Sequence, residues 1–477
     1  MPGLQRLVLV LPGIGGSVLA RPDDLDDVVW DAGKGDIADL AVRPRRMALA
    51  EIPRLEPIGL TRSTKLLGFT VVPGYERLLD RLSHIGRVDA GDPRRPVPDA
   101  DVVAVPYDFR RGVVEAAAQL DAVVTRRLAG LSESEKTARL VIVAHSLGGL
   151  VARYWLGPCG RWPWCRALIT LGTPHRGAPK ALDWLVNGVR VGGARLERPT
   201  RLLREWPSVT QLAPRYPAAL DVSVPAAEQR ALFPHELPIH WLRAGAGAAY
   251  ELHLEIERAW LDMPRGGPEM VACIGWSHPT PDAAFWDGRA LTVTKEPPHW
   301  LGLTGREKDF GDGTVPSVSA LPIELDNHIS SPIRLLDRHV PMASADIVTD
   351  LVTGYLGIAP PRQVRGDETG RRPALGLDVA ELQVAGDPIP VAVAVREVDT
   401  DPSGLAVWAT LHRSVLHETG GGSPAHVRLD WDPARSRFSG SLPGQRPGLA
   451  TLQVTVREVP SAGDLMATDT VAVVEGE

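Results

Sequence analysis

The sequence predicts an α/β domain with a mostly parallel sheet, followed by a smaller all-β domain. Up to about residue 358, short apolar runs of strand length alternate with helix-like stretches, and Gly-rich loops follow several of the runs. Strands that alternate with helices form parallel sheets buried on both faces. Beyond residue 373, short alternating stretches are separated by turns with Gly, Pro, Asp or Ser, which is typical of a β-sandwich.

The composition is that of a soluble globular protein. The chain has 477 residues, of which 44% are hydrophobic and 23% are charged. This length is too great for one ordinary core, so we expect two domains or one domain with insertions. The net charge is −6 and no basic block stands out, so we expect no nucleic-acid partner.

The cysteines and the N-terminus favour a cytoplasmic protein. Cys159, Cys165 and Cys273 are odd in number and contain no CxxC pair, which favours reduced thiols over a disulfide scaffold or a zinc site. The apolar run at residues 7–11 is ended by Pro12 and Gly13, too soon for the core of a signal peptide. No segment reads as a membrane span, and we expect no cofactor or metal.

The elements of the first domain follow from apolar periodicity. Continuous apolar runs predict strands at residues 7–11, 102–105, 140–144, 167–171, 271–275 and 333–336. Helical spacing and composition predict helices at residues 75–82, 113–131 and 343–356. Residues 21–70 are polar and rich in Pro, which indicates an insertion rather than core.

A second insertion is expected where the alternation is lost, at about residues 178–269. Apolar side chains such as Trp184, Leu203, Trp206 and Leu212 lie there among Arg, Pro and Gly, which predicts a helical cap over a cleft. One interpretation is an apolar lid for an acyl chain. The alternative is that these side chains simply pack on the sheet, which is the commoner outcome for any single residue.

Ser146 is the candidate nucleophile. It stands between a strand-length apolar run and a helix-like stretch, the layout of a nucleophile elbow. Such a turn requires small residues two before and two after the serine. They are Ala144 and Gly148, so alanine replaces the usual first glycine. The alternative is a buried strand with a serine N-cap.

A Gly-rich loop at residues 12–17 follows the first strand. It lacks the lysine of a phosphate-binding P-loop and does not match G-x-G-x-x-G. Such a loop can instead leave backbone N–H groups pointing into a cleft, as an oxyanion hole requires. A plain tight turn is the alternative.

Asp312 and His339 are the candidate acid and base. Asp312 lies between glycines in a turn, and His339 follows an apolar strand. The order Ser146, Asp312, His339 is that of an α/β-hydrolase triad, in which the imidazole takes the serine proton and the carboxylate orients the imidazole. Alternatively, Asp312 forms an Asx turn and His339 binds backbone. The rival acids are Asp326 and Asp337, the rival bases are His299 and His328, and His145 is expected to be structural.

Six motifs in this order resemble the lecithin:cholesterol acyltransferase family. They are residues 12–17, 106–110, 145–148, 172–174, 311–316 and His339. That family includes a lysosomal phospholipase and phospholipid:diacylglycerol acyltransferases. The resemblance covers residues 1–358 and implies an α/β-hydrolase fold with Ser146 as nucleophile, Asp312 as acid and His339 as base. It also implies an oxyanion hole from the backbone N–H groups of Ile14 and Leu147.

The resemblance implies a lipase, phospholipase or O-acyltransferase that acts on lipid-like esters through an acyl-enzyme. Residues 21–70 lack the cysteine pair that closes the lid of the secreted animal members. The expected cytoplasmic location also removes lipoproteins as a natural substrate, so the lipid specificity of those enzymes is not carried over. We expect a lipid or ester substrate and a transient contact of the cap with membrane surfaces. The alternative is a non-catalytic hydrolase scaffold whose β-domain binds a partner, although a scaffold needs no triad.

The predicted organisation is a hydrolase domain at residues 1–358, a linker at 359–373 and a β-sandwich domain of immunoglobulin-like type at 374–477. The expected strands of the sandwich are residues 375–384, 389–398, 406–411, 427–431, 449–456 and 468–474. No Ser, His or Cys constellation stands out there. We therefore interpret this domain as a binding or positioning module whose partner the sequence does not identify.

Overall fold

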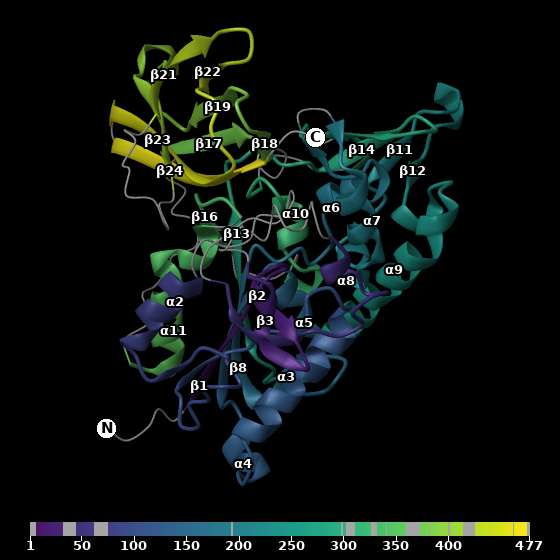
Figure 1. The fold of residues 1–477 in the computed structure, drawn as a ribbon, viewed down its shortest axis with the longest axis vertical. Coiled ribbons are helices and arrows are strands. Elements are labelled where there is room, and N and C mark those ends of the chain that lie inside the picture. The colour runs from purple at the N-terminus through teal and green to yellow at the C-terminus, as the bar shows by residue number, and fades with distance from the viewer. Residues whose placement is uncertain are drawn as a thin grey trace.

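A computed structural model shows an α/β domain followed by a β domain, as the sequence predicts (Figure 1). The structure describes residues 6–31, 44–61, 75–191, 194–296, 299–301, 311–325, 332–339, 341–358, 373–380, 382–398, 401–413, 425–460 and 462–474. None of the helices within these ranges has the length and apolarity needed to cross a lipid bilayer. The cysteines, all within these ranges, are free thiols.

The α/β domain is built on a parallel sheet of order β16-β13-β8-β7-β1-β6-β5. Its strands in chain order are β1 (Leu7–Leu11), β5 (Val88–Asp89), β6 (Val102–Ala104), β7 (Leu140–His145), β8 (Cys165–Leu171), β13 (Glu269–Gly275) and β16 (Ile333–Leu335). The central strands β1 and β7 are buried along their whole length, which explains their continuous apolar sequence. The two edge strands, β5 and β16, are short.

Helices cover both faces of this sheet. One face packs on α2 (Tyr75–Ser83) and α11 (Asp346–Leu356), and the other on α3 (Val113–Arg127) and α5 (Leu147–Leu156). Alternate residues of β1 divide accordingly, since Val8 and Val10 face the first pair and Leu9 faces the second. The short α4 (Glu133–Lys136) precedes β7.

The first insertion is partly core, which corrects the sequence interpretation of residues 21–70. Its described part forms a three-stranded antiparallel sheet and a short 3₁₀ helix: β2 (Ser17–Arg21), β3 (Asp24–Trp30), η1 (Pro44–Met47) and β4 (Glu56–Leu60). Trp30, Met47 and Leu55 are buried in the main core. The Trp30 indole stacks edge-on against Phe109 and donates a 2.9 Å hydrogen bond to the carbonyl of Gly15. This insertion therefore supports the Gly-rich loop.

The cap contains strands as well as the expected helices. Its helices are α6 (Pro179–Val186), α7 (Glu197–Glu205), α8 (Pro207–Thr210) and α9 (His240–Leu261), with 3₁₀ turns η3 (Ala226–Glu228) and η4 (Pro234–Glu236). Its strands are β9 (Arg190–Val191), β10 (Ala194–Arg195), β11 (Ala219–Asp221) and β12 (Ala231–Leu232). The sheet of β11 and β12 continues beyond the expected cap, because β11 pairs with β14 (Ala283–Trp286), which pairs with β15 (Leu291–Thr294). Strands this short carry too few residues for an alternating pattern to be recognised.

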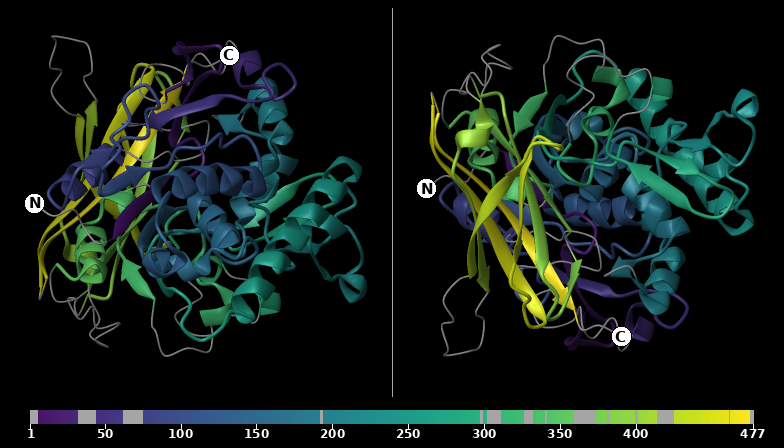
Figure 2. Two further views of the ribbon diagram at one scale, coloured as in Figure 1. Left: turned by 90° about the horizontal axis from the view of Figure 1, so that it is seen from below. Right: turned by 90° about the horizontal axis from the view of Figure 1, so that it is seen from above.

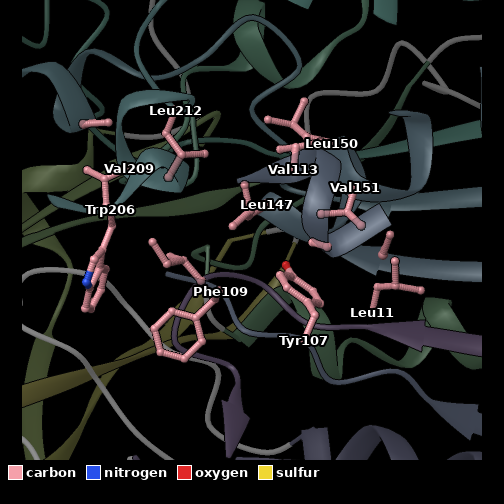
Figure 3. Packing of buried hydrophobic residues seen from close by; sticks show 14 of the residues in the cluster. Leu11, Tyr107, Phe109, Val113, Leu147, Leu150, Val151, Trp206, Val209 and Leu212 are labelled. Carbon is pink, nitrogen blue, oxygen red and sulfur yellow. The ribbon is translucent and has the colours of Figure 1, made fainter. Parts of the chain in front are cut away.

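Most of the apolar cap side chains pack on the α/β domain. Trp206, Val209 and Leu212 join Phe109 and Leu147 in one buried cluster (Figure 3). The packing interpretation is thus confirmed for these residues. In contrast, Trp241 is 48% exposed. The chain then continues through η5 (His299–Leu301), α10 (Ser317–Ala320), η7 (Ile323–Leu325) and η8 (Pro341–Ser344).

The β domain is a sandwich around its own apolar core. Its strands are β17 (Ala374–Val379), β18 (Leu382–Val384), β19 (Ile389–Arg396), β20 (Val407–Arg413), β21 (Ala425–Asp432), β22 (Arg437–Leu442), β23 (Gly448–Val459) and β24 (Gly463–Val474), with η9 (Pro402–Gly404) before β20. Pairing follows the order β17-β19-β22-β21-β20-β23-β24-β18, and β21 passes from one layer to the other. The single strand expected at 375–384 is therefore wrong, because β17 and β18 pair at opposite ends of this order.

The two domains pack against each other. Figure 2 shows the long strands β23 and β24, in yellow, on one side of the α/β domain and most of the cap, in teal, on the other. Leu382 of β18 and Ala472 of β24 are buried in the same core cluster as the central sheet. α11 ends at Leu356 and β17 begins at Ala374, and the predicted linker lies almost wholly outside the described residues.

Candidate active site

Ser146 lies in a strained turn between β7 and α5. Its backbone has φ 52° and ψ −123°, a conformation that a non-glycine residue adopts only when its surroundings impose it. The close approach of the Gly-rich loop constrains this turn, because a Cβ on Gly148 would lie 2.5 Å from the carbonyl oxygen of Pro12. A Cβ on Gly149 would overlap the side chain of Thr173. The small-residue requirement that predicted an elbow is thus a real close approach of neighbouring loops.

The structure brings the side chains of Ser146, His339 and Asp312 together. His339 Nε2 lies 3.0 Å from Ser146 Oγ, and His339 Nδ1 lies 2.6 Å from Asp312 Oδ2. All three residues are buried. An ionised carboxylate only accepts hydrogen bonds, so Nδ1–H donates to Asp312 and Nε2 is left to accept from the serine hydroxyl. Of the rivals, Asp326, His328 and the side chain of His299 lie outside what the structure describes.

Asp312 holds two roles that the sequence offered as alternatives. Its Oδ1 accepts hydrogen bonds from the backbone N–H groups of Thr314 (2.9 Å) and Val315 (2.7 Å), which is the predicted Asx-type turn. Its Oδ2 contacts His339. Burial acts to raise the pKa of Asp312, but His339 and these two N–H groups outweigh it, so the pKa is lowered. The carboxyl group is therefore ionised at neutral pH.

Glycines at the ends of two strands make room for this pair. Gly172, after β8, has φ +54°, and a Cβ there would lie 2.8 Å from Asp312 Oδ2 and 2.9 Å from His339 Nδ1. A Cβ on Gly275, the last residue of β13, would overlap Asp312 itself. The Gly-Thr-Pro motif at residues 172–174 is thus required by close contact with the candidate acid and base.

The candidate oxyanion residues lie beside Ser146. Leu147 follows it at the start of α5, and Ile14 lines the same cavity as Ser146 and His339. A Cβ on Gly13 would lie 2.9 Å from the Cβ of Ser146, so the Gly-rich loop touches the nucleophile turn. In the part of the chain that the structure describes, no hydrogen bond uses the N–H of Ile14 or Leu147. Both groups are therefore free to bind a substrate oxygen.

The motif at residues 106–110 is hydrogen-bonded to the Gly-rich loop at residues 12–17. The Tyr107 hydroxyl donates a 2.6 Å hydrogen bond to the carbonyl of Pro12. Asp108 and Arg110 form an ion pair at 2.6 Å with no exposed side-chain area. Asp108 also accepts from the N–H of Leu55, and Arg110 donates to the carbonyl of Ile52. The pair therefore fixes the first insertion against the α/β domain.

Tyr75 and His145 connect the Gly-rich loop to the loop of His339. The Tyr75 hydroxyl accepts from the N–H of Gly13 at 2.7 Å and lies 3.0 Å from His145 Nδ1. His145 Nε2 faces the carbonyl of His339 at 2.9 Å and must therefore donate its hydrogen to it. In the neutral imidazole Nδ1 is then an acceptor, so the Tyr75 hydroxyl donates its proton to Nδ1. Burial, with the nearby His339, lowers the pKa of His145 to about 3. The structural role predicted for His145 is found, whereas Tyr75 was missed because only its helical pattern was visible.

The cavity at Ser146 is mainly apolar. It is bounded by the Gly-rich loop, by α6 and by the Asp312 loop, and it opens onto Ser146 and His339. Its other lining residues are Gly13, Ile14, Tyr75, His145, Pro174, Ala178, Lys180, Ala181, Trp184, Leu212, Thr314 and Val315.

One family model and several solved structures are similar to parts or most of this chain. The family model described as lecithin:cholesterol acyltransferase matches residues 71–232. A lipase from Bacillus licheniformis in its propeptide form is 9% identical, with 98% of this chain and 94% of that chain covered and a TM-score of 0.34. A superoxide reductase from Ignicoccus hospitalis is 15% identical over 24% of this chain and 92% of its own, with a TM-score of 0.18. No curated protein sequence matches.

The matched segment begins just before α2 and includes Ser146 and most of the cap, whereas Asp312 and His339 lie beyond it. The family match therefore does not reach the candidate acid and base, whose geometry comes from the structure alone. The family match and the α/β-hydrolase architecture support an enzyme of the esterase and acyltransferase type in general terms. The resemblance of this chain to the lecithin:cholesterol acyltransferase family is thus confirmed over residues 71–232.

Proposed function

We propose that the protein is a serine-dependent lipase, phospholipase or O-acyltransferase that acts on lipid-like esters. The observation that carries this proposal is the chain of contacts from Ser146 Oγ to His339 Nε2 (3.0 Å) and from His339 Nδ1 to Asp312 Oδ2 (2.6 Å). A serine hydroxyl is a weak nucleophile, and an imidazole with a carboxylate partner is the arrangement that activates it.

In the acylation half-reaction, Ser146 Oγ attacks the acyl carbonyl while His339 Nε2 takes its proton. Asp312 stabilises the imidazolium that forms. The N–H groups of Ile14 and Leu147 bind the oxyanion of the tetrahedral intermediate. His339 then gives the proton to the leaving alcohol oxygen as the ester C–O bond breaks, which leaves the acyl group on Ser146.

In the deacylation half-reaction, a second nucleophile attacks the acyl-enzyme and His339 takes its proton. Water as the nucleophile gives a fatty acid, and an alcohol gives a new ester. The proton on His339 returns to Ser146 Oγ as the acyl group leaves. We favour hydrolysis, because water is always present whereas transfer requires an organised acceptor site that excludes it.

The apolar cavity supports a lipid-like acyl group. Ile14, Ala181 and Leu212 border it near Ser146, and these side chains offer no hydrogen bond to a polar acyl substituent. A longer acyl chain removes more apolar area from water, at about 25 cal/mol for each Å². Esters of longer acids are therefore expected to react with higher kcat/KM than acetate esters.

The test is hydrolysis of p-nitrophenyl esters of increasing chain length, with and without added alcohol. Ser146→Ala is expected to lower kcat by at least about 10³-fold. Ser208→Ala is the matched control, because its hydroxyl is buried in α8 with no hydrogen-bond partner. Activity on short, water-soluble esters alone would contradict the lipid assignment but keep the triad. No activity on any ester would contradict the proposal and favour the scaffold alternative.

A further inference from the structure

The β domain contacts the two loops that carry Asp312 and His339. Arg338, the residue before His339, is buried between the domains. Its Nε lies 3.3 Å from Asp469 Oδ2 on β24, and its Nη1 donates a 3.0 Å hydrogen bond to the carbonyl of Leu377 on β17. Arg338 therefore binds two strands of the β domain at once.

The same guanidinium lies against the Asp312 loop. Gly313, next to Asp312, has φ +89°, and a Cβ there would lie 2.6 Å from Arg338 Nη2. His339 N–H also donates to the carbonyl of Asp312 at 3.0 Å. Arg338 is thus in contact with one candidate catalytic loop and is part of the other.

A second link runs through His278. Its Nδ1 accepts from the N–H of Leu377 at 3.2 Å, so Nε2–H donates to the carbonyl of Leu336 at 2.9 Å. Its backbone exchanges hydrogen bonds with Gly311, the residue before Asp312. Burial, with the charge of Arg338, lowers the pKa of His278 to about 4, so the imidazole stays neutral at neutral pH. Both backbone groups of Leu377 are therefore held by side chains of the α/β domain.

The backbones of the two domains also approach closely at this point. A Cβ on Gly376 would overlap the carbonyl group of Ser277. The backbone of Ser277 itself has φ 85°. The Ser277 hydroxyl donates to the carbonyl of Leu375 at 3.0 Å. β17 stands at one end of the pairing order, so the backbone groups on its outer edge are not paired with another strand. Side chains from the loops of the α/β domain form hydrogen bonds with these groups.

Simple domain adhesion explains these contacts poorly. The side chains of Arg338 and Asp469 are 6% and 1% exposed. Removing two charges from water costs free energy that their attraction only partly returns, so an apolar pair of similar size holds domains together at least as well. What a directional contact supplies is geometry. Here the hydrogen bond from Arg338 Nη1 to the carbonyl of Leu377 supplies it, with Asp469 as the nearby counter-charge, and the residue so fixed is the one next to His339.

We propose that the β domain completes the active site: Asp469 and Leu377 hold Arg338 and His278, which fix the loops of Asp312 and His339. Arg338, His278 and Asp469 are then positioning residues. The inference rests on the proposed function, because it assigns a role toward the same Ser146–His339–Asp312 reaction. None of the three lines the described cavity at Ser146, so they act on the base and not on substrate binding.

The test is Asp469→Asn in the full-length chain, with kcat, KM and the melting temperature measured on an ester that the parent protein hydrolyses. The substitution keeps the shape of the side chain and removes the charge that faces Arg338. Kcat is expected to fall by about tenfold to a hundredfold, the cost of a misplacement near 1 Å, while KM changes by less than about twofold. Arg338→Met is expected to do the same, and the double variant to lose no more than either single variant.

Asp378→Asn is the matched control. Asp378 is adjacent to Leu377 on β17 and pairs across the domain boundary with Lys295 at 2.7 Å, but that contact is partly exposed and does not reach the Asp312 or His339 loops. It is expected to leave kcat unchanged.

Kcat is compared at temperatures where each variant is folded, and Arg338→Lys, which keeps the charge without the planar fork, is expected to lose less than Arg338→Met. Parental kcat in Asp469→Asn and Arg338→Met, with or without a lower melting temperature, would overturn the inference and leave a structural contact. An inactive parent protein would instead count against the proposed function.

Discussion

The two halves of the candidate active site are built differently. Ser146 follows β7 in the middle of the parallel sheet, and its turn is fixed by glycine contacts within the α/β domain. Asp312 and His339 lie on loops near β13 and β16 at the edge of the sheet, and those loops are in contact with a second domain. The candidate nucleophile is thus positioned by local sequence, whereas the loops of the candidate acid and base contact residues far along the chain.

The difference also lies in what holds each half. The nucleophile turn is held by steric contact, since Gly148 leaves no room for a side chain against Pro12. The acid–base half is held by directional polar contacts, from Arg338, His278 and the carbonyl of His339. A change in pH does not alter a steric contact, whereas it can weaken a polar contact that involves an ionisable group. The predictions that follow use this contrast.

The largest effect is expected from Asp312→Asn. Asparagine keeps an oxygen for the N–H groups of Thr314 and Val315, so the loop is retained, but its amide group favours the wrong tautomer of His339. Kcat is expected to fall by about 10⁴-fold with little change in KM. Steady-state ester hydrolysis checks this, with Asp337→Asn, the rival acid, as control. An equal loss in both variants would contradict the assignment.

Acid is expected to destabilise the fold in part through the acid–base half, alongside the buried His175 and His253, whose pKa values are also lowered by burial. The pKa values of His145 (about 3) and His278 (about 4) lie below the ordinary value of 6.5, so the unfolded chain binds more protons below pH 6.5. Their contribution is complete above pH 6.5 and is lost as the pH falls toward 4. The free energy of unfolding should decrease by about 1.4 kcal/mol for each histidine and pH unit.

Urea unfolding at pH 7.5, 6 and 5 measures this slope. His278→Gln should make the slope shallower, because the position no longer titrates. A free energy of unfolding that is constant between pH 7.5 and 5 would contradict the neutral state assigned to the buried imidazoles.

A smaller effect is expected in the nucleophile half from Gly148→Ala. The new methyl group meets the backbone carbonyl of Pro12, which cannot turn away as a side chain can. The free energy of unfolding should fall by about 1 to 3 kcal/mol. Gly247→Ala in α9 is the control, because a Cβ there meets its nearest neighbour at 4.0 Å, and helix propensity predicts a gain of about 0.5 to 1 kcal/mol. Equal changes in both variants would contradict the steric account.

The contrast between the halves also explains what the sequence could predict. Ser146, the Gly-rich loop and the chain order of Asp312 and His339 are local signals: an apolar run, a small-residue frame, a turn between glycines. Arg338 and His278 gave no such signal, because their partners Asp469 and Leu377 lie in the other domain. Tyr75 was missed for a different reason: its partners Gly13 and His145 lie in the same domain, but they are far from it in the chain and meet its hydroxyl only in the fold.

Elements were missed where local preference is weak. β22 carries Arg437, Ser439 and Gly440, which have little strand preference, and its pairing with β19 and β21 decides its structure. The first insertion reads as polar, yet Trp30, at the end of a strand that begins with exposed Asp24, is fully buried. Both are cases in which tertiary contact outweighs local pattern.

The central claim is that Ser146 is a nucleophile activated by His339. The most direct measurement is reaction of the intact protein with a fluorophosphonate probe, followed by mass spectrometry of the labelled peptide. The account predicts one adduct, on Ser146, that is absent in Ser146→Ala and unchanged in Ser208→Ala. A protein that stays unlabelled while a control serine hydrolase reacts, or an adduct that persists in Ser146→Ala, would contradict it.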